Sequence, residues 1–216
     1  MKFILSPSSI NLMEECPRCF WLDKHKVWQR PEIIPSSLMN GMDKIIKAHF
    51  DKFRDKGRLP PELENSECKH KGCKLFNDIE KLKIWRNNLI GISWEDKDGH
   101  ILRGAIDNLL VNGKKMIVLD YKTRGFPLKE TTADHYQNQL DIYTLLLEKN
   151  GYETEDYSFL LFYIPKEVLD TGEVIFDTEL VKRKVNPKRA YMLFRKSITI
   201  LEGECPKKTC KWCERI

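Results

Sequence analysis

The sequence has no long hydrophobic run. Its 216 residues contain no stretch of about 18 apolar residues, roughly the length that a membrane-spanning helix requires. The apolar stretch near the first residue is also too short for a secretory signal peptide. We therefore expect a cytoplasmic protein with no membrane partner.

The sequence also lacks a strong excess of one charge, an internal repeat and a low-complexity tract. It has 37 Lys and Arg residues against 32 Asp and Glu residues, a balance that permits a polyanionic partner without requiring one. No run of basic residues marks a substrate channel. Because 41% of the residues are hydrophobic, we expect the chain to bury a core and to fold as one domain over residues 1–216.

Apolar periodicity predicts an α/β core over residues 37–165. Apolar residues at three- and four-residue spacing favour helices, whereas alternating or continuous apolar runs favour strands. The expected order is a helix at 37–56, strands at 90–96, 101–111 and 115–121, a helix at 131–149 and a strand at 157–165. The pairs Asp98-Gly99 and Asn112-Gly113 are typical hairpin turns, so the three strands should form an antiparallel meander.

Additional segments are expected around this core. Residues 1–30 and 187–216 should contribute terminal helices, the first starting after Ser6 and the second at 187–201. A further helix is predicted at 78–89, and weaker strands at 174–176 and 180–185. Residues 57–77 are polar and are expected to be an insertion loop. For Cys68 and Cys73, which lie in that loop, we favour a solvated surface over a second metal site.

Two aspartates and a lysine are placed for chemistry on neighbouring strands. Asp120 and Lys122 lie two residues apart, so the alternation of a strand puts both side chains on one side. Antiparallel pairing should bring Asp107, in the preceding strand, beside them. Two carboxylates suit a hard cation such as Mg²⁺ or Mn²⁺. We predict Asp107, Asp120 and the carbonyl of Tyr121 as metal ligands, and Lys122 as the group that orients or activates water and stabilises developing charge.

Gln139 and Tyr143 form a second candidate group. They lie four residues apart on the predicted helix at 131–149 and therefore share one face of it. An amide and a phenol on a helix face beside the strand end are suited to contact the backbone of a substrate. We take both as candidate substrate-binding residues.

Taken together, these residues resemble a known family. Gly104-x-x-Asp107, Asp120-Tyr121-Lys122 and Gln139-x-x-x-Tyr143 are similar in order and interval to motifs II and III and the Q-x-x-x-Y motif of RecB-like nucleases in the PD-(D/E)XK superfamily. The resemblance implies a restriction-endonuclease-like mixed sheet with helices on both faces. It also implies cleavage of DNA, or alternatively of RNA, with Mg²⁺ or Mn²⁺.

The resemblance is incomplete on the first core helix. Many RecB-like nucleases carry a metal-binding histidine there, about four residues after a glycine. In this sequence Ile45 lies four residues after Gly41. His49, one turn further along, is the candidate replacement and the fourth predicted ligand of the Mg²⁺ or Mn²⁺ site.

The terminal cysteines form a separate candidate metal site. In a reducing compartment, seven cysteines indicate metal ligation or burial and not a disulfide framework. Cys16 with Cys19, and Cys210 with Cys213, are two C-x-x-C pairs, whose spacing lets two thiolates bind one metal. We predict that these four cysteines hold Zn²⁺ or a [4Fe–4S] cluster, which would join the two terminal helical segments.

A second resemblance offers a different set of ligands. Residues 5–17 are similar to the start of AddB-type and CRISPR-associated RecB-like nucleases, whose [4Fe–4S] cluster takes one N-terminal and three C-terminal cysteines. This resemblance leaves out Cys19 and implies the ligand set Cys16, Cys205, Cys210 and Cys213. Both sets remain open at the level of sequence, with the paired set preferred.

Two functional hypotheses follow from different classes of protein. The leading one is a metal-dependent deoxyribonuclease or ribonuclease, expected to be an exonuclease acting in repair, recombination or defence. The alternative is a nucleic-acid-binding protein with weak or no catalysis that retains the nuclease fold. A redox function for the C-x-x-C pairs is disfavoured, because neither pair opens a helix directly after a strand.

Overall fold

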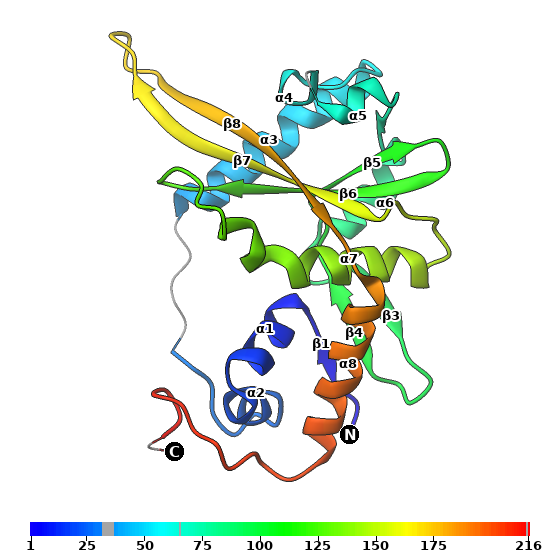
Figure 1. The fold of residues 1–216 in the computed structure, drawn as a ribbon, viewed down its shortest axis with the longest axis vertical. Coiled ribbons are helices and arrows are strands. Elements are labelled where there is room, and N and C mark those ends of the chain that lie inside the picture. Colours follow the sequence, from blue (N-terminus) through cyan, green and yellow to red (C-terminus); the bar gives the residue numbers. More distant parts are fainter. Residues whose placement is uncertain (32–36, 65, 215) are drawn as a thin grey trace.

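The computed structural model of the chain describes residues 1–31, 37–64, 66–214 and 216. Its helices and strands form a mixed α/β fold with two sheets (Figure 1). The expected α/β class is therefore confirmed. Within the described ranges, no helix is both long enough and apolar enough to cross a membrane.

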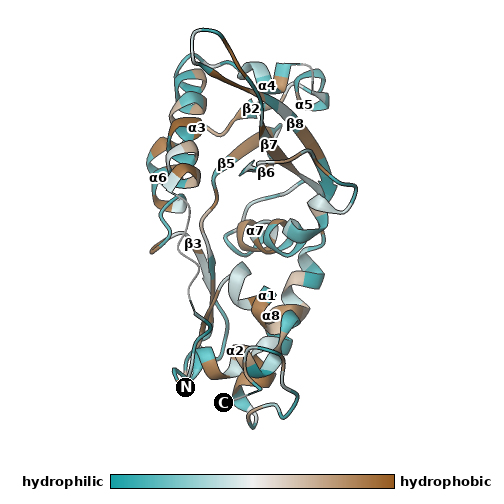
Figure 2. Cartoon of the chain, turned by 90° about the vertical axis from the view of Figure 1, so that its left-hand side faces the viewer, coloured by the Kyte–Doolittle hydropathy of each residue, from teal (hydrophilic) through white to brown (hydrophobic). Residues whose placement is uncertain are grey.

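The larger sheet has five strands in the order β2-β5-β6-β7-β8. Their bounds are β2 Lys74–Leu75, β5 Asn108–Asn112, β6 Lys115–Thr123, β7 Tyr157–Val168 and β8 Val174–Lys184. β6 and β7 run parallel, whereas the other neighbours are antiparallel. Residues 157–163 of β7 are buried, as expected of a central strand that is covered on both faces. Figure 2 shows apolar residues concentrated in these central strands.

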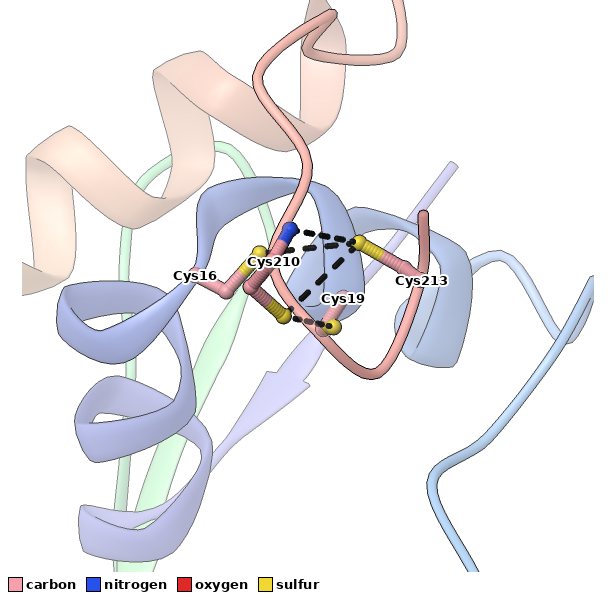
Figure 3. Close-up of side chains that lie close together, drawn as sticks. All are labelled: Cys16, Cys19, Cys210 and Cys213. Atoms are coloured by element: carbon pink, nitrogen blue, oxygen red, sulfur yellow. Dashed lines mark hydrogen bonds between the residues drawn. The ribbon is translucent and has the colours of Figure 1, made fainter. Parts of the chain in front are cut away.

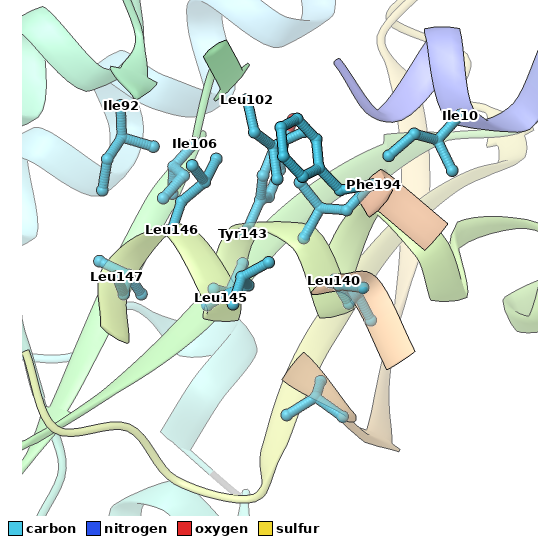
Figure 4. Packing of buried hydrophobic residues seen from close by; sticks show 14 of the residues in the cluster. Ile10, Ile92, Leu102, Ile106, Leu140, Tyr143, Leu145, Leu146, Leu147 and Phe194 are labelled. Carbon is cyan, nitrogen blue, oxygen red and sulfur yellow. The ribbon is translucent and has the colours of Figure 1, made fainter. Parts of the chain in front are cut away.

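Helices cover both faces of this sheet. On one face lies α7 (Gln137–Lys149), which packs against α1 (Pro7–Glu15) and α8 (Pro187–Glu202). Figure 4 shows side chains of α7 among apolar residues from the smaller sheet, α1 and α8. On the other face, α3 (Ser37–Asp55) buries Ile46 and Phe50 in a second core. The sheet therefore separates two apolar cores.

Alternation along β6 assigns its side chains to these two cores. Met116 and Val118 belong to the core that contains α7, whereas Leu119 packs in the core that contains α3. Asp120 and Lys122 continue the first series and point toward α7, because successive side chains of a strand point to opposite faces. The prediction that Asp120 and Lys122 share one side of a strand is confirmed.

The smaller sheet shows that the predicted strand over residues 101–111 is wrong. Here β4 (Ile101–Gly104) lies between β1 (Ile4–Leu5) and β3 (Ile92–Glu95), and after β4 the chain passes to the larger sheet at β5. At the break, the backbone N–H of Ile106 donates to the carbonyl of Trp85 at 2.9 Å instead of pairing with a strand. The expected meander is thus shared between two sheets, and Asp107 lies in the break between them.

Several other boundaries differ from the predicted ones. The helix expected at 131–149 begins as a 3₁₀ helix, η1 (Thr132–Tyr136), before α7. The helix expected at 78–89 is the shorter α6 (Ile79–Trp85), and β8 is one strand where two were expected. Residues 57–77 contain α4 (Pro61–Glu64), α5 (Glu67–His70) and β2.

The segment 57–77 is also less solvated than its composition suggests. Leu63, Cys68 and Cys73 are buried in the second core, beside α3. Cys68 and Cys73 form a disulfide, whereas the sequence indicated free thiols in a solvated loop. The difference arises because a few apolar side chains in a polar segment suffice to attach it to an exposed sheet face.

The two ends of the chain lie in the same region of the molecule. The helices α1, α2 (Pro17–Lys24) and α8 pack together there, and the C-terminal tail passes beside α2 (Figure 1). This arrangement brings the C-x-x-C pair at the start of α2 close to the C-x-x-C pair in the tail.

Candidate active site and metal centre

A cavity of about 670 Å³ opens where the break between β4 and β5 meets the end of β6. The starts of α1, α3 and α7 contribute the remaining walls. Asp107, Lys122, Gln139 and Tyr143 line this cavity, so most of the predicted catalytic and substrate-binding side chains share one space. Asp120 lies behind them and is fully buried.

Gln139 connects the members of the predicted catalytic group. Its Nε2 donates to Asp120 Oδ1 at 3.0 Å and lies 2.9 Å from the Tyr143 hydroxyl, while its Oε1 accepts from Lys122 Nζ at 3.1 Å. Lys122 Nζ also forms an ion pair with Asp120 and lies 4.7 Å from the centre of the Tyr136 ring. The amide of Gln139 therefore orients the carboxylate and the ammonium together.

Burial and neighbouring charges shift the pKa values of Asp120, Lys122 and Tyr143. Burial raises the pKa of Asp120 to about 7, although the Lys122 ammonium acts in the opposite direction. Burial acts to lower the pKa of Lys122, but the Asp120 and Asp107 carboxylates outweigh it, and the pKa lies above its ordinary value. Lys122 is therefore an ammonium at neutral pH. Burial also raises the pKa of Tyr143, which keeps its phenol neutral.

Asp107 is held by contacts from two other elements. Its Oδ2 accepts from the backbone N–H of Tyr121 at 3.2 Å, and its Oδ1 lies 2.9 Å from Lys47 Nζ of α3. Lys47 also forms an ion pair with Asp43, at 2.8 Å. The Asp107 carboxylate thus faces β6 on one side and a cationic side chain on the other.

The oxygen atoms at this site suit a hard divalent cation. Asp107 and Asp120 lie close enough for Asp107 to help raise the pKa of Asp120, so their two carboxylates converge. Asp120 Oδ2 is buried and forms an ion pair with the Lys122 ammonium. Carboxylate oxygens are the ligands that Mg²⁺ and Mn²⁺ prefer in proteins. The carboxylates of Asp107 and Asp120 therefore fit Mg²⁺ or Mn²⁺, with the Tyr121 carbonyl as a predicted further ligand.

His49 is not brought to this cavity. Its Nε2 lies 3.0 Å from Glu62 Oε1 of α4, and its ring packs against Phe50 and Phe53. Helical geometry explains the placement, because His49 follows Lys47 by two residues and points about 200° away around α3. The expected replacement of the missing family histidine by His49 is therefore not supported by its contacts.

Asp43, Lys47 and Tyr136 are site residues that the motif analysis missed. Asp43 and Tyr136 line the cavity, and Lys47 contacts Asp107. Asp43 and Lys47 are four residues apart, which is a helical ion-pair spacing that is visible in the sequence. That spacing is common on solvated helix faces, so by itself it did not indicate a functional role.

Four cysteines meet where the two ends of the chain come together (Figure 3). The sulfur atoms of Cys16, Cys19, Cys210 and Cys213 all lie within 4.8 Å of one another. Hydrogen bonds from the backbone near Trp212 and Cys213 oppose the effect of burial and lower the pKa of Cys210 to about 6. A thiolate is thus favoured at Cys210 at neutral pH, whereas burial raises the pKa of Cys16 and raises that of Cys19 to about 12.

Cys205 lies beside this group without joining it. Its sulfur accepts from Arg18 Nη1 at 3.4 Å, and Arg18 also donates to the carbonyl of Pro206 at 3.1 Å. The four clustered cysteines form the paired set that was preferred on the basis of sequence.

Comparison with known families agrees with this geometry. The model of the PD-(D/E)XK nuclease superfamily matches residues 24–215. Since this match covers most of the chain, the protein belongs to the PD-(D/E)XK nuclease superfamily, whose nucleases use divalent metals. A search of curated proteins found no match. The matched range includes Asp107, Asp120, Lys122 and the C-terminal cysteines, whereas Cys16, Cys19 and the part of the cavity wall formed by α1 precede it.

Proposed function

We propose that this chain is a Mg²⁺- or Mn²⁺-dependent nuclease of the RecB-like branch that hydrolyses phosphodiester bonds of DNA. The observation that carries this proposal is that Asp107 and Lys122 line one cavity, with the buried Asp120 paired to Lys122 directly behind it. An exonuclease with a cytoplasmic role in repair, recombination or defence is the form that we favour. RNA is the alternative substrate.

Asp107, Asp120 and the Tyr121 carbonyl would hold the metal ion. When bound, Mg²⁺ or Mn²⁺ supplies Lewis-acid stabilisation of phosphate oxygens and lowers the pKa of bound water. Because Lys122 is an ammonium, we assign it to charge stabilisation and to orienting water by hydrogen bonding, and not to proton abstraction. Gln139 keeps Lys122 and Asp120 in a fixed relation, and its contact with Tyr143 fixes the amide.

Polar side chains on the cavity wall are suited to a sugar–phosphate backbone. Ser6 and Ser8 lie at the start of α1, Asn40 lies on α3, and Arg103 lies on β4. Hydroxyl, amide and guanidinium groups are the side chains that most often contact phosphate oxygens. These contacts carry no base specificity, which is consistent with cleavage that depends little on sequence.

The contact between Lys47 and Asp107 favours a second candidate function. At 2.9 Å from Asp107 Oδ1, the Lys47 ammonium occupies space beside a predicted metal ligand. If Lys47 is not displaced by a metal ion, the chain would bind nucleic acid with weak or no cleavage. The two functions differ in turnover and not in binding.

A cleavage assay separates these two functions. The full chain would be incubated with end-labelled single-stranded DNA, double-stranded DNA and RNA, in Mn²⁺, in Mg²⁺ and in EDTA. We expect cleavage that depends on the metal ion. We also expect Asp120→Asn and Lys122→Ala to lower the rate by at least about 100-fold, since the first removes a charged metal ligand and the second removes the ammonium assigned to charge stabilisation. Binding without cleavage would favour the second function.

Asp141→Asn is the matched control for Asp120→Asn. Asp141 is also fully buried, but its carboxylate contacts Gln137, Asn186 and Arg189 instead of Lys122 and Gln139. This variant should lose stability and yet keep its cleavage rate per folded molecule. Undiminished cleavage in both Asp120→Asn and Lys122→Ala would exclude the assigned catalytic group.

A further inference from the structure

The distances among the four clustered sulfur atoms discriminate between the two kinds of metal centre. Cys16 and Cys213 are 3.8 Å apart, Cys19 and Cys210 are 3.5 Å apart, and Cys210 and Cys213 are 3.9 Å apart. Because no sulfur–sulfur distance among the four exceeds 4.8 Å, they form a small group (Figure 3).

A single tetrahedral ion requires a group of this size. With a zinc–sulfur bond of about 2.3 Å, tetrahedral geometry places the sulfur atoms about 3.8 Å apart. In a [4Fe–4S] cluster each cysteine binds a different iron, so the ligand sulfurs lie outside the cluster, roughly 6 Å apart. The observed group is too small to surround a cluster.

The contacts of Cys205 support the same conclusion. A cluster with one N-terminal and three C-terminal ligands would require Cys205 and release Cys19. The structure instead buries Cys19 within the group, at 3.5 Å from Cys210, whereas Cys205 accepts a hydrogen bond from Arg18. The ligands are two C-x-x-C pairs, the arrangement of closed structural zinc sites.

One arginine, Arg30, is placed to balance the charge of such a site, and a second, Arg18, holds the C-terminal tail. Four thiolates and one Zn²⁺ carry a net charge of about −2. Arg30 Nη2 lies 3.9 Å from the sulfur of Cys210, and its guanidinium stands 5.8 Å from the centre of the Trp212 ring. Arg18 binds the carbonyls of Pro206 and Ile216 at 3.1 and 3.0 Å, which holds the tail against α2.

We infer that Cys16, Cys19, Cys210 and Cys213 bind one Zn²⁺ ion in a closed tetrahedral site, and that this site supports the cavity wall formed by α1. The start of α1 lines the cavity through Ser6 and Asn11, and Cys16 directly follows α1. Fixing Cys16 to the C-terminal tail therefore fixes one end of α1. The zinc site does not depend on whether the chain cleaves nucleic acid.

Metal analysis of the full chain tests this inference. The protein would be purified without oxygen from cells supplied with both iron and zinc, so that an oxygen-sensitive cluster survives. We expect one zinc per chain, no inorganic sulfide and no absorption band near about 400 nm, where iron–sulfur centres absorb. Replacement by Co²⁺ should produce the visible bands of a tetrahedral cobalt thiolate site. Iron in place of zinc, at any stoichiometry, would overturn the inference.

Two serine variants identify the ligands. Cys213→Ser should lose most of its bound zinc, whereas the matched control Cys205→Ser should keep one zinc per chain. Loss of zinc from Cys205→Ser to the same extent would overturn the assigned set. If Cys213→Ser does not fold, the cobalt spectrum of the unmodified chain still counts the thiolate ligands. Asp120→Asn should retain its zinc, which separates this inference from the proposed function.

Discussion

Gly104 leaves room for an aromatic ring that the site requires. A Cβ atom added to Gly104 would lie 2.4 Å from Cε1 and 2.9 Å from Cδ1 of Tyr143. The hydroxyl of Tyr143 contacts Gln139, which in turn contacts Asp120. The glycine at the end of β4 is therefore connected to the proposed metal ligand through two side chains.

Gly104→Ala should lower both stability and cleavage. The added methyl group must displace the buried Tyr143 ring, and overpacking of this kind costs about 1–3 kcal/mol. Gly41→Ala is the control, because Gly41 lies within α3 with no atom within 4 Å of an added Cβ. It should be neutral or stabilise the fold by up to about 1 kcal/mol. Denaturant unfolding and cleavage assays would compare Gly104→Ala with the unmodified chain. Equal unfolding free energies and equal cleavage rates would contradict the connection between Gly104 and the site.

Asp120 should make metal binding depend on pH. Its pKa of about 7 means that a growing fraction of molecules carries a proton on this carboxyl as the pH falls below 7. A metal ion must displace that proton, so we expect Mn²⁺ affinity to fall by up to about tenfold per pH unit below pH 7. Titration calorimetry in buffers of different ionisation enthalpy measures the released proton. An affinity that stays constant from about pH 5 to pH 8 would disprove this role.

At the scale of elements, a chain of ion pairs joins α3, α6 and the break between β4 and β5. Arg54 of α3 pairs with Asp51 and donates to the carbonyl of Phe76 at 2.6 Å. Asp51 also pairs with Arg86 at 2.7 Å, and Arg86 Nε donates to the backbone carbonyl of Asp107 at 2.7 Å. The position of Asp107 therefore depends on residues from two helices.

Arg54→Met should destabilise the fold by about 3 kcal/mol. Arg54 is almost fully buried, and its removal leaves the carbonyl of Phe76 and the amide of Asn108 without their donor. Arg58→Met is the matched control, because Arg58 lies four residues later and is exposed; it should stay within about 0.5 kcal/mol of the unmodified chain. Equal unfolding free energies for the two variants would show that the chain of ion pairs contributes little.

At the scale of the whole molecule, the protein has two separate candidate metal-binding regions. The carboxylate site lies between the two sheets and α7, whereas the cysteine group joins the two ends of the chain. The first is built from oxygen atoms and opens to a cavity, and the second is built from sulfur atoms, of which those of Cys16, Cys19 and Cys213 belong to buried residues. Their chemistry predicts different functions for the two regions, one catalytic and one structural.

Substitutions at the two regions should therefore have different effects. Asp107→Ala should abolish cleavage with little loss of stability, because Asp107 lies at the cavity and outside both cores. Cys213→Ser should mainly lower the melting temperature, since a metal site that joins the chain ends contributes folding free energy. Thermal unfolding and cleavage by folded protein would be measured for both variants. A similar loss of stability in both would show that the two regions are not separable.

The local pattern of residues determined the helices, most strands and the shared side of Asp120 and Lys122. These features depend on apolar period and strand alternation, which are encoded in neighbouring residues. The two C-x-x-C pairs likewise indicated a metal site, and the structure brings their four sulfurs together. A local pattern does not report which distant segments meet, however.

Only the tertiary structure decided the break at residues 105–107, the place of His49 and the contacts of Lys47. The Tyr143 ring that lies against Gly104 comes from α7, and the Trp85 carbonyl that accepts from Ile106 follows from the packing of α6. The direction of His49 depends on how α3 is rotated against the sheet, which buries Phe50 and turns His49 toward α4. Such contacts join residues far apart in the chain, and they are selected by the packing of whole elements and not by local periodicity.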